Sequence, residues 1–588
     1  MRNDSFWIGV VYGIAFLQEK FLRPAAQGGR DAAEHQGLPR PSPSVRYPST
    51  MPARLLVFGL DGADWDILDP MIEAGLLPAF KALKARSVFG PLESTRPPIT
   101  AVAWTSSLTG VNPGIHGVQG FFRRGEGGTM PRLIGSGDVK SPTMFRILSD
   151  LGRSVCGLNV PFAYPPEAVN GILTSGFGTP SASAGFAHPP GAQDDLVRRF
   201  GYQPLLRSAI LKHRKPKRFL KDLESFTESH RAAAEALLSE RDWDLFFAVF
   251  DATDRLQHHF WRHFDPKHPF HPGPAHPFAQ IIPDYYVRLD RILAELIERA
   301  GPGASVMLYS DHGFGPTWRD VHLNRVLEEA GLLAWRRNPF AAGRLGQVLG
   351  RAKSAAKGVL VALRLEEVAL RLAGRAREIK RESLGPFDWS RTRAFVPVAF
   401  DRSICLNVRG RDPQGIVDPA EARSVLAEVL DLVLSLRDPA NGNAPVRAAI
   451  PREQAYHGPF TEHAPELLLD FEDGYHAVAG WGPEVFADAG AREGELSGNH
   501  RQMGLFALAA PGAKPGPAPR ALRIEDVAPT ILEALGVSIP AGLDGQSVLG
   551  GKSSSPALAT PKDPAGGSAY TPEEEAEVKR RLEDLGYL

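Results

Sequence analysis

Residues 55–117 contain LLVFGLDGADWD (55–66), PPITAVAWTSSLTG (97–110) and then His116-Gly117. Leu55 to Leu60 form a short, almost continuous apolar run that Asp61-Gly62 ends, a pattern typical of a buried parallel strand. Open α/β sheets bind ligands just outside the carboxyl ends of their strands, so Asp61 is well placed for chemistry or for a metal ion. The stretch predicts an α/β fold with a polar site at the end of its first strand.

Thr100 begins the second half of this stretch. Pro97 and Pro98 cannot continue a helix, whereas the residues after Thr100 can, so we expect Thr100 near a helix N-terminus. Free backbone N–H groups and the helix dipole favour a phosphate at such a position. A strand-ending aspartate and a threonine N-cap would explain the same pattern without any chemistry. The rest of the chain has to decide between the two interpretations.

Composition excludes some classes of partner and of site. The 588 residues contain 67 Lys+Arg and 67 Asp+Glu, so the net charge gives no reason to expect specific nucleic-acid binding. The only cysteines, Cys156 and Cys405, form neither a disulfide framework nor a Cys-rich metal site, and they favour a reducing, cytoplasmic location. Any metal must therefore be held by His and carboxylate groups.

The first fifty residues differ from the rest. The apolar run from Phe6 to Phe16 is too short to span a bilayer and is not followed by a small-residue cleavage site. The Pro- and Gly-rich sequence after it is typical of disorder. We expect residues 1–50 to be a disordered leader or a misassigned start, with Met51 as the true first residue.

The remaining chain alternates between α/β segments and insertions. We predict, in chain order, the first part of a catalytic α/β core (51–330), a helical basic insertion (331–385), a mixed insertion or cap (386–493), the C-terminal part of the core (494–550), and a linker with a C-terminal helix (551–588). For residues 338–380 within the basic insertion, three interpretations are open: an amphipathic helical pair that covers the active site, one that makes a peripheral contact with an anionic membrane, or a solvated helical insertion.

A second group of polar residues follows the apolar run from Leu245 to Phe250. Asp254 and His258 are four residues apart, so on a helix both project from one face, as a metal pair requires. Asp251 and His259 compete for the same role. An N-cap aspartate paired with a histidine is the structural alternative.

Two further candidates lie at strand boundaries. Asp311 and His312 follow the apolar run from Ser305 to Ser310 and precede two glycines, which is hard to explain by packing. His500 lies on a Gly-flanked turn before another apolar strand, where a surface histidine is the alternative.

Together these candidates suit a pair of divalent metal ions. Mixed His and carboxylate sets favour Zn, with Mn as the alternative. Paired cations can clamp the attacking and leaving oxygens of a phosphoryl transfer, and a threonine hydroxyl needs such help because it is a weak nucleophile. The candidates are Asp61, Thr100, Asp254, His258, Asp311, His312 and His500.

These residues lie in segments that resemble the alkaline phosphatase superfamily, most closely its type I phosphodiesterase/nucleotide pyrophosphatase branch and the predicted phosphohydrolases and phosphomutases near it. The matching segments, spread over residues 55–545, are GLDGADWD, RPPITAVAWTSSLTGVNPGIHGV, DATDRLQHHFW, SDHGFGP, SGNHRQMGLF and RIEDVAPTILEALGVSIPAGLDG. Their order and spacing are more specific than any one of them. The resemblance implies an alkaline-phosphatase-like central, mostly parallel sheet flanked by helices, with helical and mixed insertions.

The resemblance also implies roles for the candidates. Asp61, Asp311, His312 and the Thr100 oxygen would hold one metal ion, while Asp254, His258 and His500 would hold the other. Thr100 would attack phosphorus to give a phospho-threonine intermediate that is then hydrolysed. We therefore expect a two-metal phosphoric ester hydrolase that acts on a small-molecule phosphodiester or monoester.

One departure from the branch affects specificity. Pyrophosphatases of this branch carry an Asn after the HG motif, where this sequence has Phe121. Nucleotide diester specificity is therefore not implied. Arg123 or Arg124 is a candidate for the missing phosphoryl donor, although surface arginines would look the same. Asn159 is a candidate for lining the pocket or for a structural turn.

Other members of the superfamily provide alternatives. Sulfatases need a Cys or Ser in a C/S-x-P-x-R motif, and the sequence from Thr100 to Trp104 lacks it. A phosphomutase of the metal-dependent phosphoglycerate mutase type is the alternative enzyme, although it uses a Ser nucleophile. From another class, a non-catalytic protein that keeps its metals for stability and binds a membrane or partner remains open. The sequence does not indicate the oligomeric state.

Overall fold

The computed structural model describes residues 54–123, 132–206, 216–336, 387–397, 402–480, 482–492, 494–553 and 569–584. The predicted leader (1–50), the segment 338–380 with its suggested membrane contact, and Arg124 lie outside these residues. The division into domains therefore stays a prediction.

The core is a ten-stranded, mostly parallel sheet, as predicted, and helices flank it. Its five central strands, in the order β9-β1-β8-β5-β6, are all parallel, whereas β18 and β7 are antiparallel to their inner neighbours. Along the sheet the strands are β19 (Gly516–Pro517), β2 (Val88–Glu93), β18 (Met503–Ala509), β9 (Ser305–Ser310), β1 (Leu55–Leu60), β8 (Leu245–Phe250), β5 (Val155–Val160), β6 (Gly171–Ser175) and β7 (Ala187–His188), with β20 (Leu522–Arg523) paired to β2.

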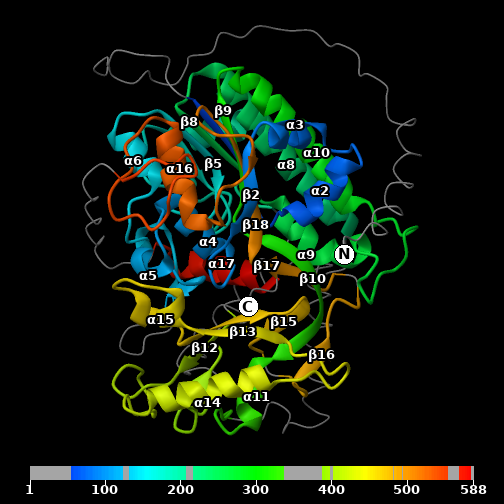
Figure 1. The fold of residues 1–588 in the computed structure, drawn as a ribbon, viewed down its shortest axis with the longest axis vertical. Coiled ribbons are helices and arrows are strands. Elements are labelled where there is room, and N and C mark those ends of the chain that lie inside the picture. The colour runs from blue at the N-terminus through cyan, green and yellow to red at the C-terminus, as the bar shows by residue number, and fades with distance from the viewer. Residues whose placement is uncertain are drawn as a thin grey trace.

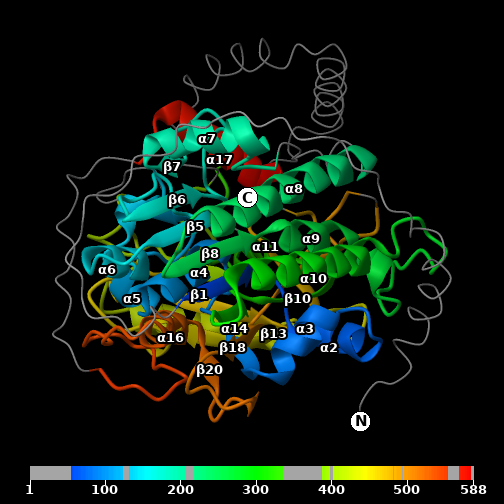
Figure 2. The same ribbon diagram turned by 90° about the horizontal axis from the view of Figure 1, so that it is seen from above.

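Helices cover both faces of this sheet because its strands are apolar on both sides. In β1, Phe58 and Leu60 pack into one core cluster and Leu55 and Val57 into the other. The first cluster includes residues of α2 (Trp65–Glu73), α3 (Pro78–Ala85), α7 (Pro190–Phe200), α8 (Pro216–Glu240), α9 (Ala252–Phe264) and α10 (Ile281–Ala300). The second includes residues of α4 (Thr100–Thr109), α6 (Met144–Asp150) and α16 (Val527–Ala534) (Figure 1, Figure 2).

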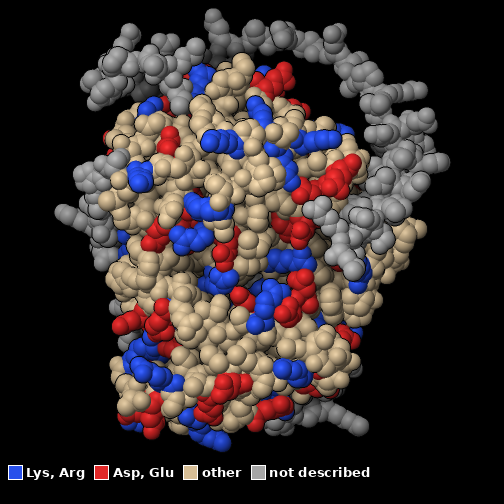
Figure 3. All heavy atoms as spheres, in the orientation of Figure 1, with Lys and Arg blue, Asp and Glu red and all other residues tan. Residues whose placement is uncertain are grey.

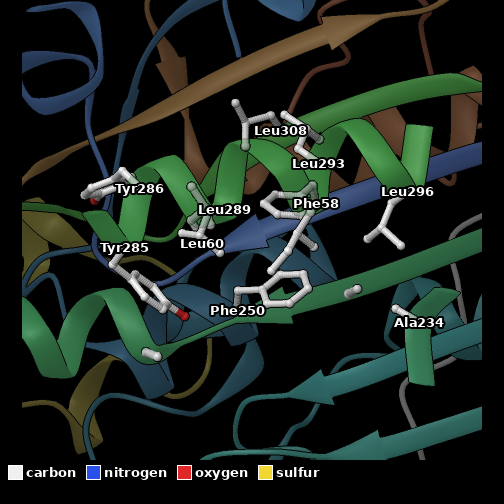
Figure 4. Packing of buried hydrophobic residues seen from close by; sticks show 14 of the residues in the cluster. Phe58, Leu60, Ala234, Phe250, Tyr285, Tyr286, Leu289, Leu293, Leu296 and Leu308 are labelled. Atoms are coloured by element: carbon white, nitrogen blue, oxygen red, sulfur yellow. The ribbon is translucent and has the colours of Figure 1, made fainter. Parts of the chain in front are cut away.

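The packing of α10 against the sheet illustrates how the core is built (Figure 4). Leu289, Leu293 and Leu296 recur at helical spacing and form one buried face of α10. They lie near Phe58 of β1 and Phe250 of β8, whose rings stack with centroids 4.8 Å apart. Each such side chain stabilises the fold by about 1.5–3 kcal/mol on burial.

A second lobe packs below the core in the view of Figure 1. We use this name for the described residues from 317 to 492, which have a hydrophobic cluster of their own. Its strands form the sheets β15-β10-β16 and β11-β12-β14-β13. The elements are β10 (Gly313–His322), α11 (Leu323–Glu329), β11 (Ala394–Phe395), β12 (Ser403–Leu406), α14 (Ala422–Ser435), β13 (Val446–Pro451), α15 (Arg452–Ala455), η5 (Thr461–His463), β14 (Leu467–Phe471), β15 (Gly474–Val478) and β16 (Phe486–Asp488).

Strand β10 connects the lobe to the core. Its first half pairs with β17 (Gly498–Arg501), where Phe314 lies opposite His500, and its second half pairs with β15, where Val321 lies opposite Ala477. The lobe is thereby held directly beside the ends of β1 and β9.

Short elements complete the core, and the C-terminal helix closes one side of it. Tyr570, Val578 and Leu582 pack with Phe121 and Tyr164 in a fourth hydrophobic cluster. The remaining elements are α5 (Pro113–His116), β3 (Phe122–Arg123), β4 (Arg132–Leu133), η2 (Ser136–Asp138), η6 (Ile524–Asp526) and α17 (Pro572–Asp584). None of the helices in the described part of the chain has the length and hydropathy needed to cross a bilayer.

Candidate metal centre

The register of the central strands brings three aspartates to one edge of the sheet. Leu60, the last residue of β1, lies opposite Phe250 of β8 and Ser310 of β9. Asp61, Asp251 and Asp311 follow these strands directly. Because all three strands are parallel, their carboxyl ends coincide, which is where ligands bind in open α/β sheets.

Asp61, Asp311 and His312 form the first part of the centre. The Nε2 atom of His312 lies 3.4 Å from Asp61 Oδ1 and 3.3 Å from Asp311 Oδ2. The backbone N–H of Gly62 donates to the other oxygen of Asp311 at 3.2 Å and holds that carboxylate in place. All three side chains are buried.

Asp254, His258 and His500 form the second part. Asp254 and His258 lie one turn apart on α9, and Asp254 Oδ1 is 3.3 Å from His258 Nε2. His500, from β17, brings its Nε2 atom within 3.0 Å of both Asp254 Oδ1 and His258 Nε2. The predicted pairing of Asp254 and His258 on one helical face therefore exists, and β17 adds the third side chain.

Thr100 and His312 join the two parts. Thr100 is the first residue of α4, and its Oγ1 lies 3.5 Å from His312 Nε2. The His312 ring stacks on the His500 ring with centroids 3.7 Å apart. Thus the structure brings together the candidates Asp61, Thr100, Asp254, His258, Asp311, His312 and His500, which we call the metal cluster.

The three histidines share one orientation. Each donates its Nδ1–H to a backbone carbonyl: His258 to Gly498 at 3.0 Å, His312 to Gly313 at 3.0 Å, and His500 to Pro98 at 2.8 Å. With Nδ1 protonated, the neutral ring carries its lone pair on Nε2, and each Nε2 points into the cluster. Backbone acceptors fix metal-binding histidines in this way.

Asp61 and Asp311 each have one carboxylate oxygen without a compensating donor among the described residues. Asp61 Oδ1 and Asp311 Oδ2 are buried and have no hydrogen-bond partner among the described residues. Burial, together with the charge of Asp254, raises the pKa of Asp61 well above its usual value. Burial and the charge of Asp61 do the same to the pKa of Asp311. Such an arrangement is costly unless a cation lies between the oxygens.

The donor geometry fits metal ions. Asp61, Asp311 and His312 form one group, and Asp254, His312 and His500 form another, each with ligand atoms within 4.8 Å of one another. Burial lowers the pKa of His500 well below its usual value, which favours the neutral ring that can bind a metal. Two groups of nitrogen and carboxylate oxygen donors suit Zn or Mn.

The competing residues have other partners. Asp251 accepts a hydrogen bond from Asn159 Nδ2 at 3.1 Å and pairs with Arg255 at 3.3 Å. The His259 ring contacts Phe219 of α8, and burial lowers its pKa to about 3. Asn159 also donates to Val249 O at 3.0 Å, so its amide ties β5 to the end of β8.

Phe121 and Arg123 lie in the segment after the HG motif, where two of the three candidates for substrate recognition were predicted. Phe121 is fully buried against Phe162 and Phe177, with ring centroids 5.4 and 6.3 Å away. Arg123, in β3, has Nη1 3.8 Å from Asp138 Oδ1. An aromatic cluster thus occupies the position where the branch has Asn.

Some residues that support the cluster were not predicted. Thr253 Oγ1 donates to Asp61 O, Gln257 Nε2 donates to Gly62 O, and Tyr286 OH donates to Gln257 Oε1 at 3.1 Å. Thr253 and Gln257 lie in the same helix as Asp254, and this proximity was the signal available in the sequence. Arg402, in the second lobe, donates to the carbonyl of His500 at 2.9 Å, and no local pattern marks it.

Comparison with known proteins gives a family match. The family model described as type I phosphodiesterase / nucleotide pyrophosphatase matches residues 55–501. Comparison with curated protein sequences gave no match.

Two solved structures are similar over most of the chain. Phosphonoacetate hydrolase from Sinorhizobium meliloti 1021, in complex with phosphonoformate, is 18% identical, with a TM-score of 0.49 over 82% of this chain and 96% of that chain. An inactive variant of murine ectonucleotide pyrophosphatase / phosphodiesterase 5, in complex with AMP, is 11% identical, with a TM-score of 0.44 over 83% of this chain and 96% of that chain.

Proposed function

The chain belongs to the type I phosphodiesterase / nucleotide pyrophosphatase family, whose model covers residues 55–501, and on this premise we propose that it is a two-metal hydrolase with Thr100 as its nucleophile. As a member of this family it is a phosphoric ester hydrolase. The observation that carries the proposal is that Thr100 Oγ1 lies 3.5 Å from His312 Nε2, inside a buried cluster of carboxylates and histidines.

The metal cluster divides into two ligand sets in this proposal. Asp61, Asp311, His312 and Thr100 hold one ion. Asp254, His258 and His500 hold the other. When bound, two divalent ions, Zn in the first place and Mn as the alternative, neutralise charge on the phosphoryl oxygens and make the threonine hydroxyl a better nucleophile.

Thr100 is positioned for the first chemical step. Its Oγ1 forms a bond to phosphorus while the bond from phosphorus to the leaving alcohol oxygen breaks, and the hydroxyl proton ends on that alcohol. The N-terminus of α4, which begins at Thr100, favours the negative charge of the transferred group. Water then cleaves the phospho-threonine, which regenerates Thr100 and releases the phosphate product.

The substrate is a small-molecule phosphate ester, and we leave open whether it is a diester or a monoester. Phe121 occupies the position where nucleotide pyrophosphatases have Asn. This difference argues against recognition of the substrate in the same way as in those enzymes. Arg123, Arg124 and Asn159 stay proposed contacts of the substrate.

Hydrolysis of two simple esters tests the proposal. Wild-type protein should contain two equivalents of divalent metal by mass spectrometry and should hydrolyse bis-p-nitrophenyl phosphate, p-nitrophenyl phosphate or both. Thr100→Ala should lower kcat by roughly four to six orders of magnitude, with metal content and Tm close to those of wild type. Thr100→Ser, which keeps a hydroxyl, should retain a large part of the activity. Full activity of Thr100→Ala would contradict the proposal.

We also propose a cytoplasmic location. The chain has only two cysteines, Cys156 and Cys405, which are both buried and too few for the disulfide framework of many exported proteins. Cell fractionation checks this, since activity confined to an exported, processed form would contradict it.

A further inference from the structure

A cavity of about 280 Å³ lies between the core and the second lobe, next to the metal cluster. Pro98 and His500 line it from the core, and Arg402, Phe471 and Tyr475 line it from the lobe. Pro98 is two residues before Thr100, and its carbonyl accepts the hydrogen bond from His500. A molecule bound in this cavity therefore lies beside His500, one proposed metal ligand.

The acidic groups of the second lobe that line this cavity already have basic partners. Figure 3 shows acidic and basic side chains next to each other across the middle of the face it presents. The pairs at the cavity are Asp470–Arg96 at 3.2 Å, Glu472–Arg447 at 2.8 Å and Asp473–Arg501 at 2.7 Å. These carboxylates and arginines largely neutralise one another.

The acidic groups that come from the core are also accounted for. Asp64 accepts hydrogen bonds from the backbone N–H groups of Ile67 and Phe314, both at 3.0 Å. Asp66 is largely exposed and lies 3.7 Å from Arg501. Neither carboxylate is paired with Arg402.

Arg402 differs from the other arginines of the cavity. It is only 8% exposed, and within the described residues it makes one hydrogen bond, to His500 O, and no ion pair. Burial lowers its pKa to about 10, so the group remains charged at neutral pH. A guanidinium group has five N–H donors, so the residues that the structure describes leave most of the donor capacity of Arg402 unused. A buried cation in this state is unfavourable unless an anion approaches it.

Asn499 provides a second unused donor in the same wall. Its Oδ1 accepts the backbone N–H of His500 at 2.8 Å, whereas its Nδ2 is buried without a hydrogen-bond partner among the described residues. Asn499 and Arg402 thus hold the two sides of the His500 peptide backbone, and both line the cavity. Together they bring a guanidinium and an amide to the wall of one small cavity.

We propose that this cavity binds an anionic group of the substrate, a carboxylate or a second phosphoryl group, other than the phosphoryl group that reacts. Arg402 and Asn499 are its donors. The reacting phosphoryl group is a poor candidate because neither Thr100 nor the cluster carboxylates line the cavity. The volume, near the lower end of typical ligand pockets, suits a small acidic group rather than a whole nucleotide.

This assignment rests on the proposed function, so its test needs matched esters. The two probes are p-nitrophenyl 2-carboxyethyl phosphate and p-nitrophenyl propyl phosphate, which differ in the presence of the carboxylate. Wild-type protein should have the lower KM for the carboxyethyl ester. Arg402→Gln should raise that KM by roughly 10- to 100-fold and leave the KM for the propyl ester within about twofold. Arg402→Lys should restore part of the preference.

Two further variants separate recognition from a structural role. Asn499→Asp keeps the oxygen that accepts the His500 N–H but replaces the donor by a carboxylate oxygen, so it should abolish or reverse the preference. Arg447→Gln changes an arginine of the same cavity that is already paired with Glu472, and the preference should persist. If Arg402→Gln weakened the hydrolysis of both esters equally and also lost metal, Arg402 would only position His500. That result would overturn the proposal.

Binding of the two esters to a catalytically inactive variant distinguishes this proposal from the proposed function. Isothermal titration of Thr100→Ala with each ester should give tighter binding of the carboxyethyl ester, and this difference should disappear in the Thr100→Ala/Arg402→Gln double variant. Binding without any preference in Thr100→Ala would overturn the anion site even if hydrolysis is established. A preference without turnover in the wild type would keep the site and overturn the hydrolytic mechanism.

Discussion

Two buried aspartates, one in the metal cluster and one in the second lobe, have opposite surroundings. Asp311 and Asp438 are both 0% exposed. Asp438 accepts hydrogen bonds from Arg319 Nε at 2.8 Å and Nη2 at 2.9 Å, and this arginine lowers the pKa of the carboxyl group. Asp311 lies beside Asp61 instead, and burial and that neighbouring charge raise its pKa.

The contrast distinguishes a buried charge that stabilises the fold from buried charges that are arranged to bind a ligand. In the second lobe, the Arg319 guanidinium supplies the cation, so the site is complete without a ligand. In the metal cluster, Asp61 Oδ1 and Asp311 Oδ2 have no hydrogen-bond partner among the described residues, and His312 Nε2 lies 3.4 and 3.3 Å from them. Because unpaired buried carboxylates are costly, the cluster is arranged for cations that the chain itself does not provide.

The largest expected difference between the two regions is the effect on kcat/KM of replacing each aspartate by asparagine. Asp311→Asn should lower kcat/KM by roughly 1,000-fold or more, because bound metal contributes several kcal/mol to the stability of the transition state. Asp438→Asn should leave kcat/KM within about twofold but lower the free energy of unfolding by about 1–3 kcal/mol. Steady-state kinetics and urea unfolding of both variants check this. Similar kinetic losses in both variants would remove the distinction.

Removal of metal should affect the two regions unequally. Chelation should lower the free energy of unfolding by about 4 kcal/mol if the free ion had been present at 1,000 times its dissociation constant. Hydrogen exchange should accelerate at the carboxyl ends of β1 and β9 and in β17, but not in β13 to β15. Mass spectrometry of exchanged peptides measures this, with Zn re-addition as the control. Uniform loss of protection would mean that the lobe also depends on metal.

Replacing Arg319 in the second lobe should leave a buried carboxylate without a cationic partner there, as in the metal cluster. Arg319→Gln leaves Asp438 buried without its main partner and should destabilise the protein by about 3 kcal/mol. Since Arg319 holds the pKa of Asp438 below 3.8, its stabilisation is present above this pH and is lost on further acidification. The difference in unfolding free energy between wild type and variant should therefore narrow as the pH falls. Urea unfolding across this range measures it, and a constant difference would contradict the assignment.

Arg123 gives the smallest expected effect, because its ion pair with Asp138 spans 3.8 Å and Arg132 also binds that carboxylate at 2.9 Å. Arg123→Gln should change the free energy of unfolding by less than about 0.5 kcal/mol. If Arg123 contacts the substrate as proposed, KM for a p-nitrophenyl ester should rise by about 10-fold. An unchanged KM would mean that Arg123 does not contact the substrate.

The fold and the metal cluster were predictable where the signal is local. Asp61 and Asp311 directly follow apolar runs, and Asp254 and His258 have helical spacing. Strand and helix periodicity therefore identified them as candidates. The sequence did not distinguish Asp254 from Asp251. That distinction depends on Asn159 and Arg255, which reach Asp251 from β5 and from the next turn of α9.

The remaining features depend on contacts between segments far apart in the chain. Arg402 and Asn499 meet around His500 only because the second lobe packs on β17. Arg402 belongs to none of the matching segments, and Asn499 lies in one of them without being marked for a role of its own. The same holds for Arg319 and Asp438, which are brought together by the lobe fold. Local periodicity contains no information about such pairs.

The central claim is that Thr100 carries the phosphoryl group during turnover. The most direct measurement is acid quenching of metal-loaded wild-type protein during hydrolysis of p-nitrophenyl phosphate, followed by peptide mass spectrometry. We predict a phosphoryl adduct on Thr100 that is absent from Thr100→Ala and disappears when the substrate is exhausted. Rapid turnover with no adduct at any quench time, or an adduct on another residue, would contradict the mechanism.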